Sequence, residues 1–190
     1  MKYYELNANR YINDTYECDM SNLYNFFEKY LKAGARILDL GFGSGRDSLY
    51  FQKKYEVVGI DPTEVFCKHA KEIGVKNVLC MKAEDMIFNN EFDAIWACSS
   101  LLHINKNDLN NVFKKCSNAL KENGIMYCSF KYGTFEGIKN DRYFIDLTEE
   151  SIKEYLKDTG LNILETIITN DVRPGRENEK WLNLMTKKIS

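Results

Sequence analysis

The fold of this chain is decided by the stretch Arg36-Ile37-Leu38-Asp39-Leu40-Gly41-Phe42-Gly43-Ser44-Gly45-Arg46-Asp47. Apolar residues up to position 40 are typical of a strand that is buried on both faces. The glycines at 41, 43 and 45 let the backbone turn tightly and approach a ligand, because no Cβ stands in the way. A helix capped by Ser44 or Asp47 is predicted next. Its free N–H groups can hold a carboxylate, a ribose or a phosphate.

A second apolar stretch, residues 56–60, ends in Asp61 about 20 residues after the glycine turn. In nucleotide-binding βαβ units, an acid at this place accepts hydrogen bonds from ribose hydroxyls. Pro62 stops the strand and can occupy the first turn of the next helix. The glycine turn and Asp61 together predict a nucleoside-binding site.

Length and composition narrow the class of protein. A chain of 190 residues is expected to form one domain, and a net charge of -2 gives no basic surface for nucleic acid or an anionic membrane. No apolar run is long enough to span a bilayer, and the start, Met1-Lys2-Tyr3-Tyr4-Glu5, lacks the apolar core of a signal peptide. We therefore expect a cytoplasmic protein.

The six cysteines form no CxxC pair, and several lie in apolar stretches. This pattern predicts buried, reduced thiols and neither a disulfide framework nor a zinc site. The two histidines, His69 and His103, are far apart in sequence, and no metal site is predicted.

Strands and helices alternate along most of the chain. Strands are predicted over residues 36–40, 56–60, 77–81, 92–98, 124–131, 161–169 and 181–188, and helices over 19–34, 47–54, 63–73, 106–121 and 148–158. Residues 1–20 are predicted to form a lid-like or irregular segment. Such alternation indicates a parallel sheet with helices on both faces.

The chain resembles the class I S-adenosylmethionine-dependent methyltransferases over about residues 35 to 188. The residues that carry the resemblance are Leu38-Asp39-Leu40-Gly41-Phe42-Gly43-Ser44-Gly45 (first motif), Asp61 (second motif), Met81-Lys82-Ala83-Glu84-Asp85 (adenine loop), Phe92-Asp93-Ala94-Ile95-Trp96-Ala97 (fourth strand) and Leu120-Lys121-Glu122-Asn123-Gly124-Ile125 (lead-in to the fifth strand). Within the superfamily it is most similar to small bacterial enzymes of the tellurite-resistance type, which tend to carry counterparts of residues 129–133 and 173–176.

The resemblance implies an α/β, Rossmann-like three-layer sandwich whose mostly parallel seven-stranded sheet has an antiparallel last strand. It implies a single domain over residues 1–190, with 1–33 as an N-terminal lid or cap and 35–188 as the core. The implied cofactor is S-adenosyl-L-methionine, which leaves as S-adenosyl-L-homocysteine. The residues expected at the cofactor are Tyr4, Tyr11, Asp39, Gly41, Phe42, Gly43, Arg46, Asp61, Pro62, Ala83, Glu84, Asp85, Ala97 and Cys98.

Two positions depart from the family pattern. Phe42 replaces a residue that is usually small, and it either packs under the helix or crowds the ligand. Lys82 stands where an Asp or Asn often reaches the adenine amino group, so adenine recognition is expected from the Ala83 N–H and from Glu84 or Asp85.

For several of these residues, a purely structural role is the alternative to ligand binding. Asp39 either holds the amino group of the methionine moiety or caps the loop. Arg46 either pairs with the ligand carboxylate or is an exposed helix arginine. Tyr4 and Tyr11 either fold over the donor as a lid or pack within the N-terminal segment.

The acceptor is expected to be a small molecule, and its site lies in the second half of the chain. His103, just past the fourth strand, is either a general base or a packing histidine. A cluster of cations in this half of the chain can bind an anionic acceptor. Alternatively, its members are solvated charges paired with Asp171, Glu177 or Glu179. The candidate acceptor residues are His103, Lys131, Arg142, Arg173 and Arg176, with His103 and Lys131 as candidate catalytic groups.

Other functions fit the sequence less well. A nicotinamide dehydrogenase would pair Tyr127 with Lys131 on one helical turn, but in a strand these positions lie roughly 13 Å apart. A nucleic-acid amino-methyltransferase would carry an Asp/Asn-Pro-Pro-aromatic motif where this chain has Ala97-Cys98-Ser99-Ser100. A non-catalytic donor-binding sensor or partner protein stays open, because methyl transfer requires no obligatory catalytic side chain. The oligomeric state is also open.

Overall fold

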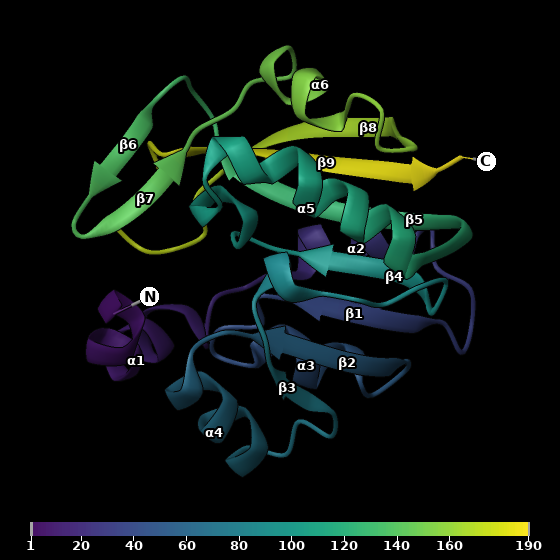
Figure 1. Ribbon diagram of the computed structural model, residues 1–190. Coiled ribbons are helices and arrows are strands. Elements are labelled where there is room, and N and C mark those ends of the chain that lie inside the picture. The colour runs from purple at the N-terminus through teal and green to yellow at the C-terminus, as the bar shows by residue number, and fades with distance from the viewer. Residues whose placement is uncertain (1, 190) are drawn as a thin grey trace.

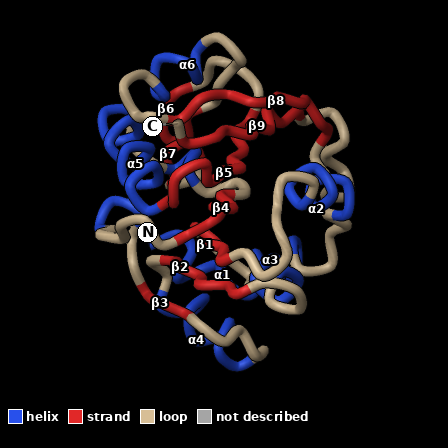
Figure 2. Tube along the Cα trace, turned by 90° about the vertical axis from the view of Figure 1, so that its right-hand side faces the viewer, coloured by secondary structure: helices blue, strands red, loops and turns tan. Residues whose placement is uncertain are grey.

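A computed structural model describes residues 2–189, in which one sheet is covered by helices on both faces (Figures 1 and 2). The strands of this sheet are β1 (Arg36–Leu40), β2 (Glu56–Asp61), β3 (Val78–Cys80), β4 (Phe92–Ala97), β5 (Leu120–Lys131), β8 (Leu161–Asn170) and β9 (Lys180–Lys188). Their order across the sheet is β3-β2-β1-β4-β5-β9-β8, and β9 runs antiparallel to both of its neighbours. The predicted fold class, a mostly parallel seven-stranded sheet with an antiparallel last strand, is confirmed.

The strands alternate between two apolar cores, as a sheet buried on both faces requires. On β1, Ile37 faces the helices α2 (Ser21–Glu28) and α3 (Arg46–Phe51), whereas Leu38 faces α5 (Lys106–Ala119) and α6 (Ser151–Leu156). On β4, Trp96 joins the first core and Ile95 the second. Burial of each large apolar side chain stabilises the fold by roughly 1.5–3 kcal/mol.

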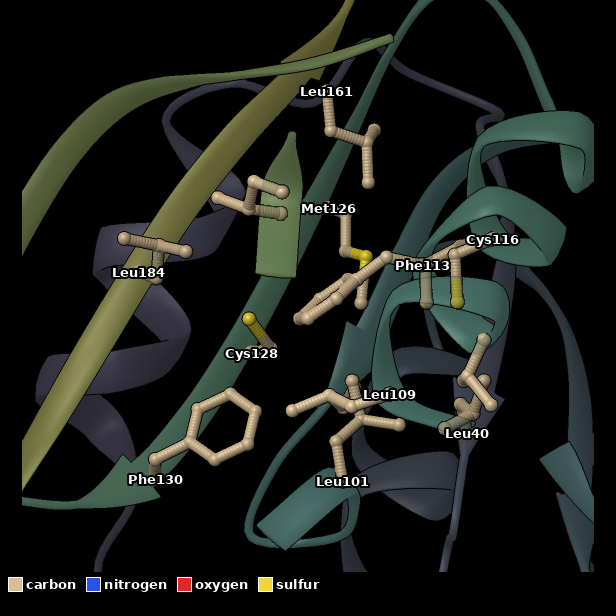
Figure 3. Close-up of a cluster of buried hydrophobic side chains, with 14 of the residues drawn as sticks. Leu40, Leu101, Leu109, Phe113, Cys116, Met126, Cys128, Phe130, Leu161 and Leu184 are labelled. Atoms are coloured by element: carbon tan, nitrogen blue, oxygen red, sulfur yellow. The ribbon is translucent and has the colours of Figure 1, made fainter. Parts of the chain in front are cut away.

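The second core is built mainly by α5 and the middle of β5 (Figure 3). Figure 3 shows Leu109, Phe113 and Cys116 of α5 facing Met126 and Cys128 of β5. All five side chains have no exposed surface. This packing fixes the distance of α5 from the sheet. It therefore also fixes the position of residues 98–105, which connect β4 to α5.

The predicted helices are present, but several are shorter than the sequence indicates. The helix predicted over 19–34 ends at Glu28, and the one predicted over 148–158 spans Ser151–Leu156. The helix predicted over 106–121 ends at Ala119, because β5 already begins at Leu120. Residues 121–124 lie in a bulge, since Phe92 pairs with Leu120 while Ala94 pairs with Ile125.

The N-terminal segment is a helix, α1 (Lys2–Thr15), with a kink at Asn7. The prediction of an irregular segment is therefore wrong for these residues, although α1 does lie over one end of the sheet (Figure 1). Its apolar side is formed by Tyr4, Ala8 and Tyr11, which pack with Phe66 of α4 (Glu64–Glu72). This spacing of three and four residues is helical, but tyrosines and one alanine make it a weak apolar stripe.

A two-stranded hairpin, β6 (Glu136–Lys139) and β7 (Arg142–Ile145), stands apart from the main sheet and was not predicted. Its turn residues Asn140 and Asp141 have φ of 50° and 57°, which is the left-handed conformation that a two-residue hairpin turn requires. The hairpin and α1 lie at the same end of the molecule, toward which the arrowheads of β1, β2 and β4 point (Figure 1). Among the described residues, no helix combines the length and apolar character needed to cross a membrane.

Candidate functional site

The glycine turn after β1 adopts a conformation that only glycine takes readily. Gly41, Gly43 and Gly45 have φ of 79°, 53° and 77°. A Cβ on Gly41 would lie 2.4 Å from the Cβ of Ser100, so a side chain cannot be accommodated there. The backbone of this turn is therefore held directly against the segment that follows β4.

Asp61, at the end of β2, is tied to the glycine turn. Its two carboxylate oxygens accept hydrogen bonds from the backbone N–H of Gly43 (3.1 Å) and of Thr63 (2.9 Å). Burial raises the pKa of Asp61, although the two N–H groups act in the opposite direction. Each oxygen keeps a second lone pair, so the carboxylate is still able to accept hydroxyl groups of a sugar.

Asp39 is buried beneath the turn and accepts a hydrogen bond from Ser48 Oγ at 2.5 Å. Burial and the nearby charge of Asp47 raise the pKa of Asp39. Asp39 lines neither of the cavities described below. Its contact with Ser48 joins β1 to α3, which agrees with a structural role for Asp39.

The buried Asp47 and the partly buried Arg46 form an ion pair at the start of α3. Asp47 accepts hydrogen bonds from Tyr24 Oη (2.6 Å) and Trp96 Nε1 (2.9 Å), and Arg46 donates to both of its oxygens. Burial disfavours the charge, but Arg46 and the hydrogen bonds lower the pKa of Asp47 overall. Arg46 also donates to the carbonyl of Thr15 (2.8 Å), so it connects α1 to α3 and is not an exposed helix arginine.

Two cavities lie side by side at this end of the sheet. The first, about 210 Å³, is lined by the glycine turn, Asp61 and the start of α4, and by residues 81–84. The second, about 130 Å³, extends from Arg46 and Cys98 to β7 and to the loop over residues 170–176. Five residues line both cavities: Tyr4, Tyr11, Gly41, Ser99 and His103. Two molecules bound in the two cavities would meet at these five residues.

His103 lies at this junction with both ring nitrogens engaged. Nδ1 is 2.8 Å from the carbonyl oxygen of Tyr143, which can only accept, so Nδ1 carries the proton. Nε2 is then the acceptor of the Tyr4 hydroxyl, at 2.8 Å. Burial lowers the pKa of His103 to about 4, with a further contribution from the charges of Arg142 and Lys131. The imidazole is therefore neutral near pH 7.

The four predicted cations all line the second cavity, but three of them are paired. Lys131 binds Glu179, Arg173 binds Asp171 through two hydrogen bonds, and Arg176 is 3.9 Å from Glu179. The alternative interpretation, pairing with acids of the same loop, is thus observed for Lys131, Arg173 and Arg176.

Arg142, the fourth cation, has no ion pair among the described residues. It donates to Tyr4 Oη at 3.2 Å, and its buried Nε has no hydrogen-bonding partner within residues 2–189. Its guanidinium carbon is 4.2 Å from the ring centroid of Tyr3 and 5.0 Å from that of Phe144. The aromatic rings hold the guanidinium in place while its donors remain largely unused.

Most of the residues predicted at the cofactor do line one of the cavities. The first cavity includes Gly43, Asp61, Pro62, Ala83 and Glu84, the second includes Phe42, Arg46 and Cys98, and both include Tyr4, Tyr11 and Gly41. Asp39, Asp85 and Ala97 line neither. Phe42 packs with Phe66 in a small apolar cluster, which fits its packing interpretation.

Sequence analysis missed Thr63, Phe66, Ser99 and Ser100, which also line the first cavity. Ser99 and Ser100 directly follow β4, and this position at the carboxyl end of a parallel strand was a usable signal. Phe66 gave no such signal, because a phenylalanine on the apolar side of a helix is expected to be a residue of the hydrophobic core.

Comparison with known proteins identifies related sequences and folds. Residues 37–124, just under half of the chain, match the family model described as methyltransferase domain. A phosphoethanolamine N-methyltransferase from Plasmodium falciparum is 27% identical over 136 residues, which cover 63% of this chain and 51% of the relative. The chain thus spans about half the length of that curated relative.

Among the solved structures that match, two align over the whole chain. A 1,6-didemethyltoxoflavin-N1-methyltransferase from Burkholderia thailandensis, with 1,6-didemethyltoxoflavin and S-adenosylhomocysteine bound, aligns with a TM-score of 0.79 at 17% identity, covering 100% of this chain and 85% of that one. A S-adenosylmethionine-dependent methyltransferase from Clostridium acetobutylicum aligns with a TM-score of 0.71 at 19% identity, covering 100% and 98%. Residues 37–124 are thus similar to a methyltransferase domain, and the whole chain shares the fold of these two methyltransferases.

Proposed function

We propose that this chain transfers the methyl group of S-adenosylmethionine to a small, anionic acceptor. The observation that carries the proposal is the pair of cavities that meet at Tyr4, Tyr11, Gly41, Ser99 and His103. A methyl donor and an acceptor need adjoining sites with a shared boundary, because the acceptor lone pair must lie in line with the S–CH₃ bond. Orientation of this kind is worth roughly 7–11 kcal/mol.

The donor occupies the first cavity and extends into the part of the second that Arg46 and Cys98 line, which leaves the part toward β7 to the acceptor. Asp61 receives the ribose hydroxyls, while Ala83 and Glu84 lie at the adenine end. The methionine part passes Gly41 toward Arg46. The matched methyltransferase domain includes β1, β2 and the adenine-side segment, so it supports this placement.

The acceptor occupies the second cavity, with its anionic group on Arg142. Arg142 lines this cavity, and its guanidinium, which lies near the rings of Tyr3 and Phe144, has donors that are not used in an ion pair among the described residues, so it can bind a phosphate, a carboxylate or an oxyanion. The Plasmodium relative is named for a phosphorylated amine, and the tellurite-resistance resemblance suggests a chalcogen oxyanion. Both have the negative charge that Arg142 can bind.

The transfer itself requires little covalent chemistry from the protein. The acceptor lone pair forms a bond to the methyl carbon, and the electrons of the breaking C–S bond remain on sulfur, which becomes a neutral thioether. Nε2 of the neutral His103 accepts the Tyr4 hydroxyl, so a proton from an acceptor that carries one would reach His103 through that hydroxyl: Tyr4 takes the proton and gives its own to Nε2. Lys131 is engaged with Glu179, so we assign it to holding the wall of the cavity.

Donor binding is the first test. Isothermal titration with S-adenosylhomocysteine is expected to give saturable one-to-one binding, and Asp61→Asn is expected to weaken it at least tenfold. The variant keeps the size of the side chain but loses the negative charge and one acceptor oxygen. Asp85→Asn is the matched control, since Asp85 lines neither cavity, and it should bind within twofold of the parent chain.

Turnover is the second test. Release of S-adenosylhomocysteine is measured over a panel of phosphorylated amines, carboxylated amines and chalcogen oxyanions. Turnover confined to anionic acceptors supports the proposal. Tight donor binding without turnover across the panel would instead indicate a donor-binding sensor, and absence of donor binding would reject both functions.

A further inference from the structure

Cys67 and Cys80 come together beside the proposed donor site. Cys67 lies on the buried side of α4 and Cys80 is the last residue of β3, two elements that are neighbours in the structure (Figure 1). Burial and the neighbouring Cys80 thiol raise the pKa of the Cys67 thiol. Cys67 is buried, whereas Cys80 is exposed to solvent.

Both cysteines are connected to Asp61. Cys67 Sγ donates to the backbone carbonyl of Asp61 at 3.2 Å, and the N–H of Met81 donates to the same oxygen at 3.1 Å. Cys80 is the residue directly opposite Asp61 in the pairing of β2 with β3. The thiol pair therefore lies next to the ends of two strands of the sheet: the end of β2, which carries the proposed ribose carboxylate Asp61, and the end of β3, which leads into the adenine-side segment.

We propose that Cys67 and Cys80 form a redox-active thiol pair, which a peroxide converts to a disulfide that weakens binding of the adenosyl donor. The effect on the donor rests on the proposed function, whereas formation of the disulfide does not.

The chemistry requires two steps and one equivalent of peroxide. The exposed sulfur of Cys80 attacks a peroxide oxygen, the O–O bond breaks, and Cys80 becomes a sulfenic acid with release of water. The sulfur of Cys67 then attacks the sulfur of Cys80, and its proton leaves with the departing hydroxide as a second water. Two thiols are oxidised by two electrons, and the hydrogen peroxide is reduced to two molecules of water.

Closure of the disulfide has a direct consequence for Asp61. The two sulfurs must approach to about 2.05 Å, so Cys67 gives up its hydrogen bond to the Asp61 carbonyl. The end of β3 is then drawn toward α4, and Met81 moves with it because it follows Cys80 directly. The ribose carboxylate and the adenine-side segment would lose their present spacing.

Peptide mapping tests the disulfide. The chain is treated with one equivalent of hydrogen peroxide, alkylated and digested with trypsin without reduction, which separates Cys67 (peptide 55–68) from Cys80 (peptide 77–82). We expect these two peptides to be cross-linked and to separate after reduction. Cys116 and Cys128 serve as the internal control, in peptides 116–121 and 122–131, because these neighbouring thiols are fully buried. They should remain free.

Titration with S-adenosylhomocysteine tests the effect on the donor site, after removal of the peroxide. We expect the oxidised chain to bind at least fivefold more weakly, with full recovery after dithiothreitol. Cys80→Ser should bind like the reduced parent and should not respond to peroxide, and Cys67→Ser, which keeps a donor to the Asp61 carbonyl, should behave likewise. Cys116→Ala, at a thiol that lines neither cavity, is the matched control and should respond to peroxide as the parent does.

Failure of this inference can be told apart from failure of the proposed function. A reduced chain that binds no donor contradicts the proposed function, whatever the peptide map shows. A reduced chain that binds donor, but gives no 55–68 to 77–82 cross-link, overturns the thiol pair. A cross-link that leaves donor affinity unchanged overturns its effect on the donor site.

Discussion

His103 shows how single contacts set the chemistry of a residue. The Tyr143 carbonyl fixes the proton on Nδ1, and the Tyr4 hydroxyl occupies Nε2. The sequence placed His103 just past the fourth strand, and in the structure it lies in the short helical turn Leu101–His103 that follows β4. Neither of its partners could be predicted, because Tyr4 is 99 residues away and the Tyr143 contact is made by a backbone atom.

The neutral state of His103 predicts a pH dependence of stability. The pKa of His103 is about 4 in the folded chain against 6.5 for the ordinary side chain. Between these values the unfolded state takes up a proton that the folded state does not, so the free energy of unfolding falls as the pH drops. This contribution is absent above pH 6.5 and reaches about 3 kcal/mol near pH 4.

Urea unfolding at pH 7 and at pH 4 measures this contribution when the parent chain is compared with His103→Gln. The carboxylates titrate in both proteins, so their effects cancel in the comparison. We expect the parent to lose about 3 kcal/mol more than the variant over this range. Equal losses in the two proteins would show that His103 is not held neutral by its surroundings.

Asp61 and Asp39 mark the limit of residue-level prediction. The spacing from the glycine turn correctly placed Asp61 at the first cavity, because strand, turn and helix fix that distance in a βαβ unit. The same motif does not say whether an acid at position 39 faces a ligand or a neighbouring side chain. That choice depends on Ser48, which lies within hydrogen-bonding distance only once α3 has packed on the sheet.

At the scale of elements, α1 and the β6–β7 hairpin close the site from two sides, and Arg142 joins them. Its guanidinium contacts the rings of Tyr3 of α1 and Phe144 of β7, and it donates to Tyr4. The main strands were predictable because apolar runs bounded by glycine and proline are strong signals. The hairpin was missed although Asn140-Asp141 is a suitable turn, because its two strands are short and partly exposed.

Arg142→Lys tests this arrangement. Lysine keeps the charge but loses the planar guanidinium that contacts the two rings and presents parallel donors. With an acceptor from the panel, we expect KM for the acceptor to rise about tenfold while the affinity for S-adenosylhomocysteine changes less than twofold. Arg176→Lys is the matched control, because Arg176 faces Glu179, and it should leave both quantities nearly unchanged. A similar rise in KM for both variants would contradict the special role of Arg142.

At the scale of the whole molecule, a single sheet connects both halves of the chain. β4 and β5 pair in parallel at its centre, and β9 returns from the C-terminal end to pair with β5. Trp96 lies in the middle of the sheet and Trp181 at the start of β9, where its indole donates to Asp171. The two tryptophans therefore report on different parts of the same sheet.

We expect one cooperative unfolding transition, as proposed for a single domain. Tryptophan fluorescence and far-ultraviolet circular dichroism should give the same urea midpoint within each of two single-tryptophan variants, Trp96→Phe and Trp181→Phe. Comparison within one variant removes any effect of the substitution on stability. Two separate midpoints in either variant would indicate that the sheet unfolds in parts.

The position of α1 has a practical consequence for work with the purified protein. Tyr4 borders both cavities only a few residues from the start of α1, while the end of β9 emerges at the opposite end of the molecule (Figure 1). An affinity tag fused ahead of α1 would lie near both cavities and would distort binding measurements. A tag placed after β9, or one removed by a protease before assay, avoids this.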